Sequence, residues 1–407
     1  MSIPDYISKQ KEIQRCLLEF INHKSSEKAY YLNLLKLLDN PEIRNSPSEL
    51  STTLRLLLEI ANNHHRLPDF FNKITQVLLL FKDDIKKHFS NMELFHLFKK
   101  NKEILLILIE QKMLTIDQEI VDVFTSPKFR QHRYPCYFSP EIQNFEIDSH
   151  IQREIKTKID ECNKSGPDAF EKRRKAGENY IQFCHFIRKD SLEEFTAYVN
   201  ENKLSLSTAI EPSIFETNYF LVNRIPTLIE YCAFFGSLRI LNYLIENNVK
   251  IPPSIWIYAI HSQSMDLLHL IEEKKVLPQD QTYVECFTEA VKCHHIEMAE
   301  YFKTVYLHNQ IPDNARVASQ IIRFRNYTYF PEDLSTPNNF YDLCKYNYIK
   351  LVDLILTEVG DIDTNIRIIS NLFVLNKISN LFVLNRIPII NYFNTIPNDF
   401  FFHHISI

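Results

Sequence analysis

Residues 226–251, PTLIEYCAFFGSLRILNYLIENNVKI, predict two short antiparallel helices joined by a tight turn at Gly236. In the first helix, Cys232 and Ala233 are small enough to let another helix approach closely. In the second helix, apolar residues recur at helical spacing and form one face: Leu238, Leu241, Leu244 and Ile245. Two helices this short cannot bury their apolar faces alone, so the segment predicts similar helix pairs stacked beside it.

The composition fits a soluble folded protein and argues against several classes of enzyme. Of the 407 residues, 45% are hydrophobic and 24% are charged, which are ordinary values. The formal net charge of −5 creates no global field that favours nucleic acid or an anionic membrane. The four glycines are far apart, whereas phosphate-binding loops need several glycines at fixed offsets. The sequence therefore predicts no P-loop, dinucleotide-binding or kinase motif.

The start of the chain and its cysteines predict an intracellular protein. Residues 1–12 are polar and charged, unlike a secretion signal. The longest apolar runs are far shorter than the ~20 residues that a membrane helix needs. The eight cysteines form no Cys-x-x-Cys pair, which indicates free, mostly buried thiols in a reducing compartment. We expect a cytoplasmic location without membrane association, with a nuclear location as the alternative.

Helical periodicity predicts a helical N-terminal region over residues 1–130. Expected helices cover residues 5–22, 30–38, 46–63, 68–89 and 92–98. The run ILLILIE at 104–110 resembles residues 240–246 and 266–272. The N-terminal region is therefore either a divergent part of the same stack or a separate domain. Over residues 131–177 the pattern weakens and prolines interrupt it, so we interpret that segment as a connector with one exposed helix at 151–159.

Residues 178–365 predict further helix pairs. The expected pairs are 181–187 with 192–199, 254–262 with 265–274, 284–293 with 295–305, and 340–346 with 349–357. Asp190 is expected to occupy the place that Gly236 takes later. Small residues in the first helices mark the register: Ala233, Ala259, Ala290 and Cys344. Their intervals are 26, 31 and 54 residues, and the longest leaves room for a degenerate repeat or a long loop.

Residues 366–407 form a tail of a different kind. The segment ISNLFVLNK at 369–377 is followed directly by ISNLFVLNR at 378–386. This tandem copy is compatible with a strand pair, a short helix or a disordered segment. Its apolar residues would be an aggregation risk if exposed.

The stretch at 226–251 resembles the ankyrin-repeat pattern Thr-Pro-Leu-His-x-Ala-Ala-x-x-Gly-His-x-x-Val-Val-x-x-Leu-Leu. Matching positions are held by Leu228, Cys232, Ala233, Gly236, Ser237, Leu244 and Ile245. Ankyrin repeats have a period near 33 residues, close to the shorter spacings above. Pro226-Thr227 replaces Thr-Pro, and most other pairs lack the turn glycine. The resemblance implies an all-α solenoid of stacked helix-turn-helix repeats.

A longer likeness covers most of the chain. The segments that carry it are IRKDSLEEF at 187–195, PSIFETN at 212–218, LIEYCAFFGS at 228–237 and WIYAIHS at 256–262. They resemble a large family of ankyrin-repeat proteins from trichomonad-type flagellate protists. Its members carry a helical N-terminal region of unknown function, then divergent repeats, then regular ankyrin repeats. The likeness implies an interaction role with no catalytic residues, and the odd tail takes the place of the regular repeats.

No metal, cofactor or catalytic site is predicted. The closest approach to a metal-binding pattern is a group of four residues: Cys286, Cys293, His294 and His295. On a helix, Cys286 and Cys293 would lie about 10 Å apart, too far for both to bind one zinc ion at ~2.3 Å. His294 stands where ankyrin repeats often place a turn histidine. The pairs His64-His65 and His403-His404 have no partner motif. Common catalytic motifs such as His-Glu-x-x-His or Gly-x-Ser-x-Gly are absent.

We therefore expect a non-enzymatic, monomeric scaffold that binds an unidentified protein through its repeat surface. The candidate partner-binding residues are Phe234, Phe235, Arg239, His261 and His294. Two alternatives remain open. One is a nuclear or nucleic-acid-associated role through the basic run 172–175, although we do not favour the hypothesis of nucleic-acid binding. The other is a degenerate family copy without function.

Overall fold

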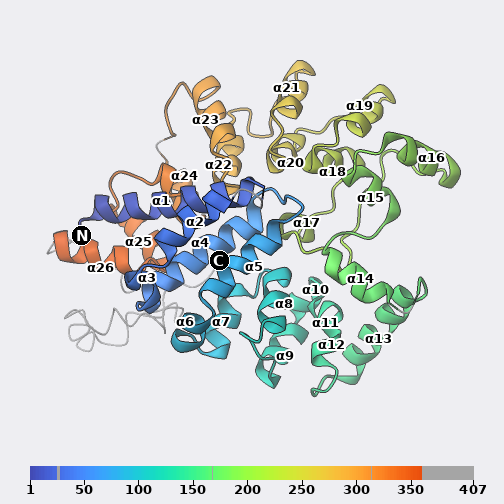
Figure 1. The fold of residues 1–407 in the computed structure, drawn as a ribbon. Helices are drawn as coiled ribbons and strands as arrows, with labels where there is room; N and C mark the ends of the chain where they lie inside the picture. Colours follow the sequence, from blue (N-terminus) through green and yellow to red (C-terminus); the bar gives the residue numbers. More distant parts are fainter. Residues whose placement is uncertain (25–27, 167, 313, 360–407) are drawn as a thin grey trace, which may run out of the picture. The chain divides into compact units, whose positions relative to one another are not determined.

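The computed structural model describes residues 1–24, 28–166, 168–312 and 314–359, which are predominantly helical (Figure 1). They form 26 α-helices and one 3-10 helix, and the described part contains no strand beyond an isolated bridge between Ala209 and Thr227. The prediction of an all-α protein is confirmed. No described helix combines the length and apolar character needed to cross a bilayer. The tandem copy predicted at 369–386 lies outside the described residues.

The N-terminal helices follow the predicted positions closely. They are α1 Ile3–Asn22, α2 Lys28–Leu38, α3 Pro41–Arg44, α4 Pro47–Asn63, α5 Phe70–Leu80, α6 Lys82–His88, α7 Asn91–Phe98, α8 Lys102–Glu110, α9 Gln118–Thr125 and α10 Pro127–Gln131. The single helix predicted over 68–89 is wrong, because the chain leaves the helical conformation at Phe81, whose ring is fully buried. Two acidic residues in the first turn then favour a new helix start, α6.

The segment interpreted as a connector is largely helical. It contains α11 Tyr134–Tyr137, α12 Ser139–Ile142, α13 Ser149–Asn163 and α14 Ala169–Ala176. The helix predicted at 151–159 is confirmed by α13. Pro127, Pro135 and Pro140 stand in the first turn of α10, α11 and α12. There the missing N–H is not needed for the helix, so these prolines begin helices instead of interrupting them.

Successive helix pairs follow from residue 182. They are α15 Gln182–Arg188 with α16 Leu192–Asn202, α18 Leu228–Phe235 with α19 Leu238–Glu246, α20 Ile255–His261 with α21 Met265–Glu273, and α22 Val284–Lys292 with α23 Ile296–Val305. The short α17, Tyr219–Val222, precedes α18. The first helices contact one another in sequence order, α15 with α18, α18 with α20, and α20 with α22 (Figure 1). Each pair therefore packs against the next through its first helix.

One backbone conformation recurs wherever a first helix ends. Two residues before the next helix, the chain adopts a positive φ of 49–68° at Asp190, Gly236, Gln263, His294, Arg325 and Asn347. In five of these turns the next N–H donates to the carbonyl four residues before the positive-φ residue, as Ser237 does to Cys232 at 2.9 Å. This is the Schellman arrangement, in which a left-handed residue satisfies the last carbonyls of a helix.

These turns correct the register inferred from small residues. Ala259 and Ala290 lie four residues before their turn residues, whereas Ala233 lies three residues before Gly236. Ala259 and Ala290 therefore match Cys232 in place of Ala233. The predicted match of Asp190 to Gly236 is confirmed by their common positive φ.

A side chain from one pair also bonds to the preceding pair. Ser237 Oγ donates to the Ile187 carbonyl at 2.5 Å, and His295 Nδ1 lies 2.8 Å from the Ile260 carbonyl. Both donors directly follow their turn residue, and both carbonyls lie three residues before the earlier one. The Tyr348 hydroxyl makes the same connection to Ile322, at 2.6 Å.

The 54-residue interval holds a degenerate pair. Helix α24, Ala315–Arg323, ends in the same turn at Arg325, but a 3-10 helix, η1 Tyr327–Tyr329, replaces the second helix. The last described elements are α25 Pro337–Lys345 and α26 Ile349–Val359. The long-loop alternative is therefore excluded by α24.

Contacts divide the chain into two compact units. Unit 1 contains Met1–Glu19, Ala29–Leu56 and the described residues from Pro312 onward, and unit 2 contains Phe20–Lys28 and Leu57–Ile311. In unit 1, the Gln14 side chain accepts from Tyr327 N at 2.7 Å and donates to Asn326 at 3.0 Å. These two units differ from the predicted domains, whose boundaries were placed at residues 130, 177 and 365. Those domain boundaries stay a prediction.

The turn geometry predicts how Gly236 tolerates substitution. An added Cβ would make an ordinary 3.4 Å contact with Ser262, so the cost lies in the φ of +68°. We expect Gly236→Val to destabilise the protein by roughly 1–2 kcal/mol, Gly236→Asn by less, and Gln263→Gly to be neutral or stabilising. Urea unfolding measures all three. Wild-type stability of Gly236→Val would contradict the left-handed assignment.

Candidate functional site

The five predicted partner-binding residues occupy different environments. Phe234, His261 and His294 are 6%, 3% and 2% exposed, whereas Phe235 is half-buried. Arg239 lies in solvent at the start of α19 and pairs with Glu193 of α16 at 2.6 Å. Phe235 and Arg239 therefore remain accessible as predicted anchors, and the other three side chains are packed inside unit 2.

The Phe234 ring belongs to an aromatic stack. It lies parallel to Phe220 of α17 with a centroid distance of 5.5 Å, and parallel to the His261 ring at 5.2 Å. The Phe235 ring meets it edge-on at 4.9 Å. Phe220 of α17 thus contacts a ring of α18 and a ring of α20. The stack therefore holds α17 against the helix pairs.

The segment between α4 and α5 reaches the ends of the first helices α20 and α22. His64 Nδ1 lies 2.8 Å from the carbonyl of Cys293, which ends α22. The N–H of His65 points to Nε2 of His295 at 3.4 Å, and the rings of His64 and His295 meet edge-on at 4.8 Å. Together with His261 these residues form a histidine cluster: His64, His65, His261 and His295. The sequence shows no partner motif beside His64-His65, because the histidines that they meet are distant along the chain.

Hydrogen bonds define the protonation state of this cluster. Burial lowers the pKa of His64 to about 4 and lowers that of His295 well below its usual value. His64 Nδ1 lies 2.8 Å from the Cys293 carbonyl oxygen, and its Nε2 lies 2.8 Å from Asn22 Oδ1. A neutral ring can donate to only one of these two oxygens, so a neutral His64 that donates to Cys293 requires the Asn22 amide to be turned so that its NH2 group faces Nε2. A neutral His295 donates from Nδ1 to Ile260 and accepts from His65. Each nitrogen of these two rings is therefore used.

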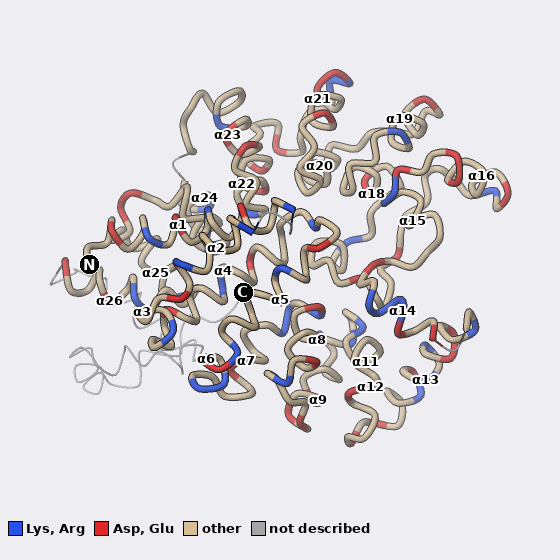
Figure 2. Tube along the Cα trace, in the orientation of Figure 1, with Lys and Arg blue, Asp and Glu red and all other residues tan. Residues whose placement is uncertain are grey.

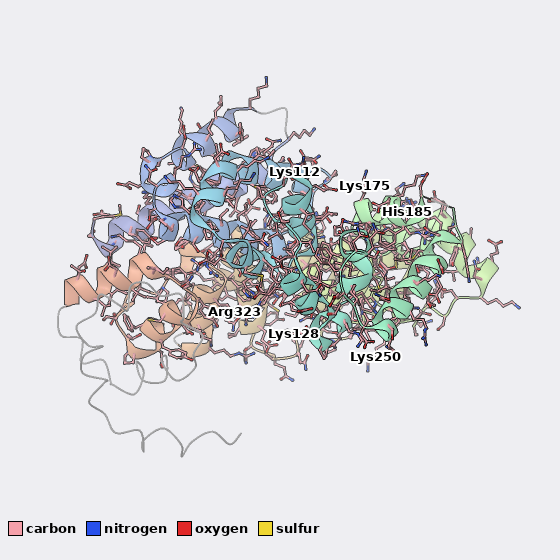
Figure 3. The ribbon with its side chains drawn as sticks, turned by 90° about the horizontal axis from the view of Figure 1, so that it is seen from below. Lys112, Lys128, Lys175, His185, Lys250 and Arg323 are labelled. Atoms are coloured by element: carbon pink, nitrogen blue, oxygen red, sulfur yellow. The ribbon has the colours of Figure 1, made fainter. Side chains whose placement is uncertain are left out.

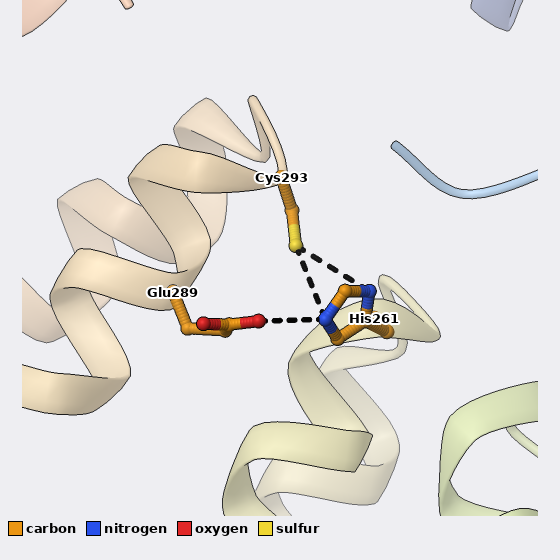
Figure 4. A group of neighbouring side chains, drawn as sticks. All are labelled: His261, Glu289 and Cys293. Atoms are coloured by element: carbon orange, nitrogen blue, oxygen red, sulfur yellow. Dashed lines mark hydrogen bonds and ion pairs between the residues drawn. The ribbon is translucent and has the colours of Figure 1, made fainter. Parts of the chain in front are cut away.

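His261 joins Glu289 and Cys293 in a second buried group (Figure 4). His261 Nε2 lies 2.7 Å from Glu289 Oε1, which also accepts from Lys292 Nζ at 2.7 Å. Burial would raise the pKa of Glu289, but Lys292 and His261 outweigh it and hold that pKa far below its usual range. The carboxylate is therefore ionised and its charge is balanced by Lys292.

The side chains of His261, Glu289 and Cys293 are poorly arranged for binding a metal ion, and Cys293 is a poor nucleophile. Their ligand atoms lie within 4.8 Å of one another, but Nε2 and Glu289 Oε1 already face each other. Cys293 Sγ lies 3.6 and 3.7 Å from both ring nitrogens, off the lone pair of either. Burial raises the pKa of this thiol well above 9, and a protonated thiol is a poor nucleophile and ligand. A divalent ion would have to displace Lys292.

The basic run 172–175 lies in α14 (Figure 2), and two of its four side chains make contacts within the chain. Arg174 is buried and pairs with Glu141 at 2.5 Å. The Arg173 guanidinium lies over the Tyr180 ring at 4.3 Å and donates to Ser165. Only Lys172 and Lys175 extend into solvent, which leaves little charge for a phosphate backbone or an import receptor.

Exposed aliphatic residues recur in the loops that precede the first helices. In the loops before α18, α20, α22 and α24, an aliphatic residue stands directly before a proline: Ile225, Ile251, Leu277 and Ile311. Ile225, Leu277 and Ile311 are 56%, 55% and 37% exposed, and Ile251 is half-buried. We call these four positions the loop tips. Their aliphatic–proline pattern is visible in the sequence, but only the structure shows that the side chains are outside.

Comparison with models of protein families, with curated proteins and with solved structures finds no match to this chain.

The aromatic stack predicts opposite behaviour for two of the candidate anchors. Phe234→Ala should destabilise the protein by about 3 kcal/mol, because it empties a buried ring site. Arg239→Ala should change stability little, because its ion pair with Glu193 is exposed. Urea denaturation followed by circular dichroism compares them. An unchanged midpoint for Phe234→Ala would show that the ring is not part of the core.

Burial of His64 predicts a loss of stability in acid. Its folded pKa of about 4 lies below the unfolded value near 6.5, so the unfolded chain takes up the proton first. The stabilisation that neutral His64 gives the folded state is fully present above pH 6.5 and is lost as the pH falls towards 4. At pH 4.5 the loss in unfolding free energy is about 2.5 kcal/mol.

The measurement is the difference in unfolding free energy between pH 7 and pH 4.5. His64→Gln should reduce this difference relative to wild type, whereas His150→Gln, at an exposed position of α13, serves as the control and should leave it unchanged. Identical pH dependence in all three proteins would contradict the burial of a neutral His64.

Proposed function

We propose that this chain is a non-enzymatic scaffold, related to divergent ankyrin-repeat proteins, that binds another protein through its loop tips. The observation that carries the proposal is the recurrence of exposed aliphatic residues before successive first helices. Exposed apolar side chains at regular intervals along a repeat stack are suited to a partner surface. The helix pairs with their common turn support an ankyrin-like solenoid, in which such loops project from one edge.

The internal contacts of the first helices support the choice of the loop tips. In ankyrin-like stacks the first helices and their turns commonly contribute to binding, which is why Phe234, His261 and His294 were candidates. Here His64 and His65 contact the turn after α22, His65 also bonds to the backbone of His261 at the end of α20, and α17 covers the Phe234 ring. A partner would have to displace these segments to reach the first helices. The loop tips, together with Phe235 and Arg239, need no such displacement.

The test compares protein capture by wild type, one triple variant and one double variant of the full chain. Ile225→Ser, Leu277→Ser and Ile311→Ser together remove the exposed aliphatic side chains of the loop tips. Leu79→Ser and Val305→Ser remove exposed aliphatic side chains of α5 and α23, which are 40% and 49% exposed, and serve as the matched control. All three proteins should show the same circular dichroism and melting midpoint.

We expect at least one protein captured from the source cells to lose tenfold or more in affinity with the triple variant, since ~1.4 kcal/mol corresponds to a factor of ten. The control should retain it. Binding that survives the triple variant, or that is lost equally in the control, would contradict the role of the loop tips.

A further inference from the structure

Unit 2 contains a cavity of about 160 Å³ beside the start of α8. Four lysines line it: Lys99, Lys100, Lys102 and Lys128. Lys128, which lines the cavity, and Lys250, which does not, are both labelled in Figure 3. The rings of Phe129, Tyr134 and Tyr219 also line the cavity, and no acidic residue does. In the described part of the chain none of the four lysines forms an ion pair with a carboxylate.

Lys102 is the buried member of this set. It is the first residue of α8 and is 3% exposed. Its ammonium group donates to the carbonyls of Ile214 and Glu216 at 3.2 and 3.3 Å. The Tyr134 and Tyr137 rings lie 5.5 and 5.3 Å from it. These contacts fix the side chain and leave one of its three N–H groups for a ligand.

The charges around the cavity are not balanced. Burial lowers the pKa of Lys102 to about 7, although Glu216 opposes this. Burial and then Lys128 and Lys100 lower the pKa of Lys99, and burial and then Lys102 and Lys128 lower that of His132. Neighbouring lysines therefore disfavour the charged forms of Lys99 and His132, whereas burial disfavours that of Lys102. A bound anion would relieve this repulsion, and the positive end of the α8 dipole adds to the attraction.

We propose that this lysine pocket binds the phosphate group of a phosphate monoester. A phosphate dianion brings about two charges and three strong acceptor oxygens, which suits several ammonium donors better than a single carboxylate does. The volume is below the roughly 300 Å³ of pockets for drug-sized ligands, so it accommodates one phosphate and a small organic group. Phe129 and Tyr134 would contact the organic part. This site is separate from the loop tips and does not depend on the proposed function.

Binding should be linked to protonation of Lys102. The anion favours the charged ammonium group, so affinity is highest where Lys102 is protonated and falls as the pH rises above 7. The other groups that act on Lys102 are the Glu216 carboxyl, the Cys136 thiol of α11 and the Arg133 guanidinium. His132 also faces it.

Isothermal titration calorimetry of the full chain tests the pocket with inorganic phosphate, phenyl phosphate and phenol. We expect phenyl phosphate to bind more tightly than inorganic phosphate, and phenol not to bind. Tighter binding of inorganic phosphate would assign the site to free phosphate and overturn the monoester. Absence of binding by both phosphates at millimolar concentration would overturn the pocket itself.

Three variants connect binding to these residues. Lys102→Met keeps the length of the buried side chain and should weaken phenyl phosphate binding at least tenfold and abolish its dependence on pH between 7 and 8.5. Lys99→Gln with Lys128→Gln should weaken it less. Lys250→Gln, at an exposed position after α19, should leave it unchanged. An equal affinity of wild type and Lys102→Met, with both proteins folded by circular dichroism, would contradict the proposal.

Discussion

The left-handed residue at the end of each first helix is the constraint on which the arrangement of the helix pairs depends. It turns the chain sharply enough for the second helix to begin two residues later. Five of the six positions carry a residue other than glycine, although such residues adopt this conformation at a cost. The cost is offset where the turn is held by its neighbour. Asp190, for example, accepts from the N–H groups of Arg239 and Ile240, both at 3.0 Å, and so caps α19.

Segments from the N-terminal third complete this arrangement. In unit 2, His64 bonds to the turn after α22, and in unit 1, Gln14 bonds to the turn after α24. Buried carbonyl and N–H groups must find partners, and these side chains supply them. The consequence for function is that the first helices face the chain's own residues. The loop tips and the lysine pocket remain as surfaces that a ligand can reach.

Local patterns in the sequence were sufficient to predict most helices and the pairing of residues 228–246. Apolar spacing and the turn glycine act over a few residues, so one sequence reveals them. The helix break at Phe81 was missed because it depends on where that ring is buried. The burial of Phe234 and His261 was missed for a similar reason. Phe220 of α17 contacts both rings, and His65, which is distant in sequence, bonds to the backbone of His261. The grouping of Lys99 with Tyr219 in one cavity is likewise a long-range property.

The stacking of successive pairs can be measured by pulsed electron paramagnetic resonance within unit 2. Glu193, Arg239, Asp266 and Glu297 each lie three residues after a turn residue and are exposed. The eight native cysteines are buried, so cysteines introduced at these positions can be labelled selectively. If the pairs are stacked in order, the distance from residue 193 to residues 266 and 297 grows with each pair, by about 8–10 Å per step. A distance from 193 to 297 that is no longer than that from 193 to 266 would contradict the stack.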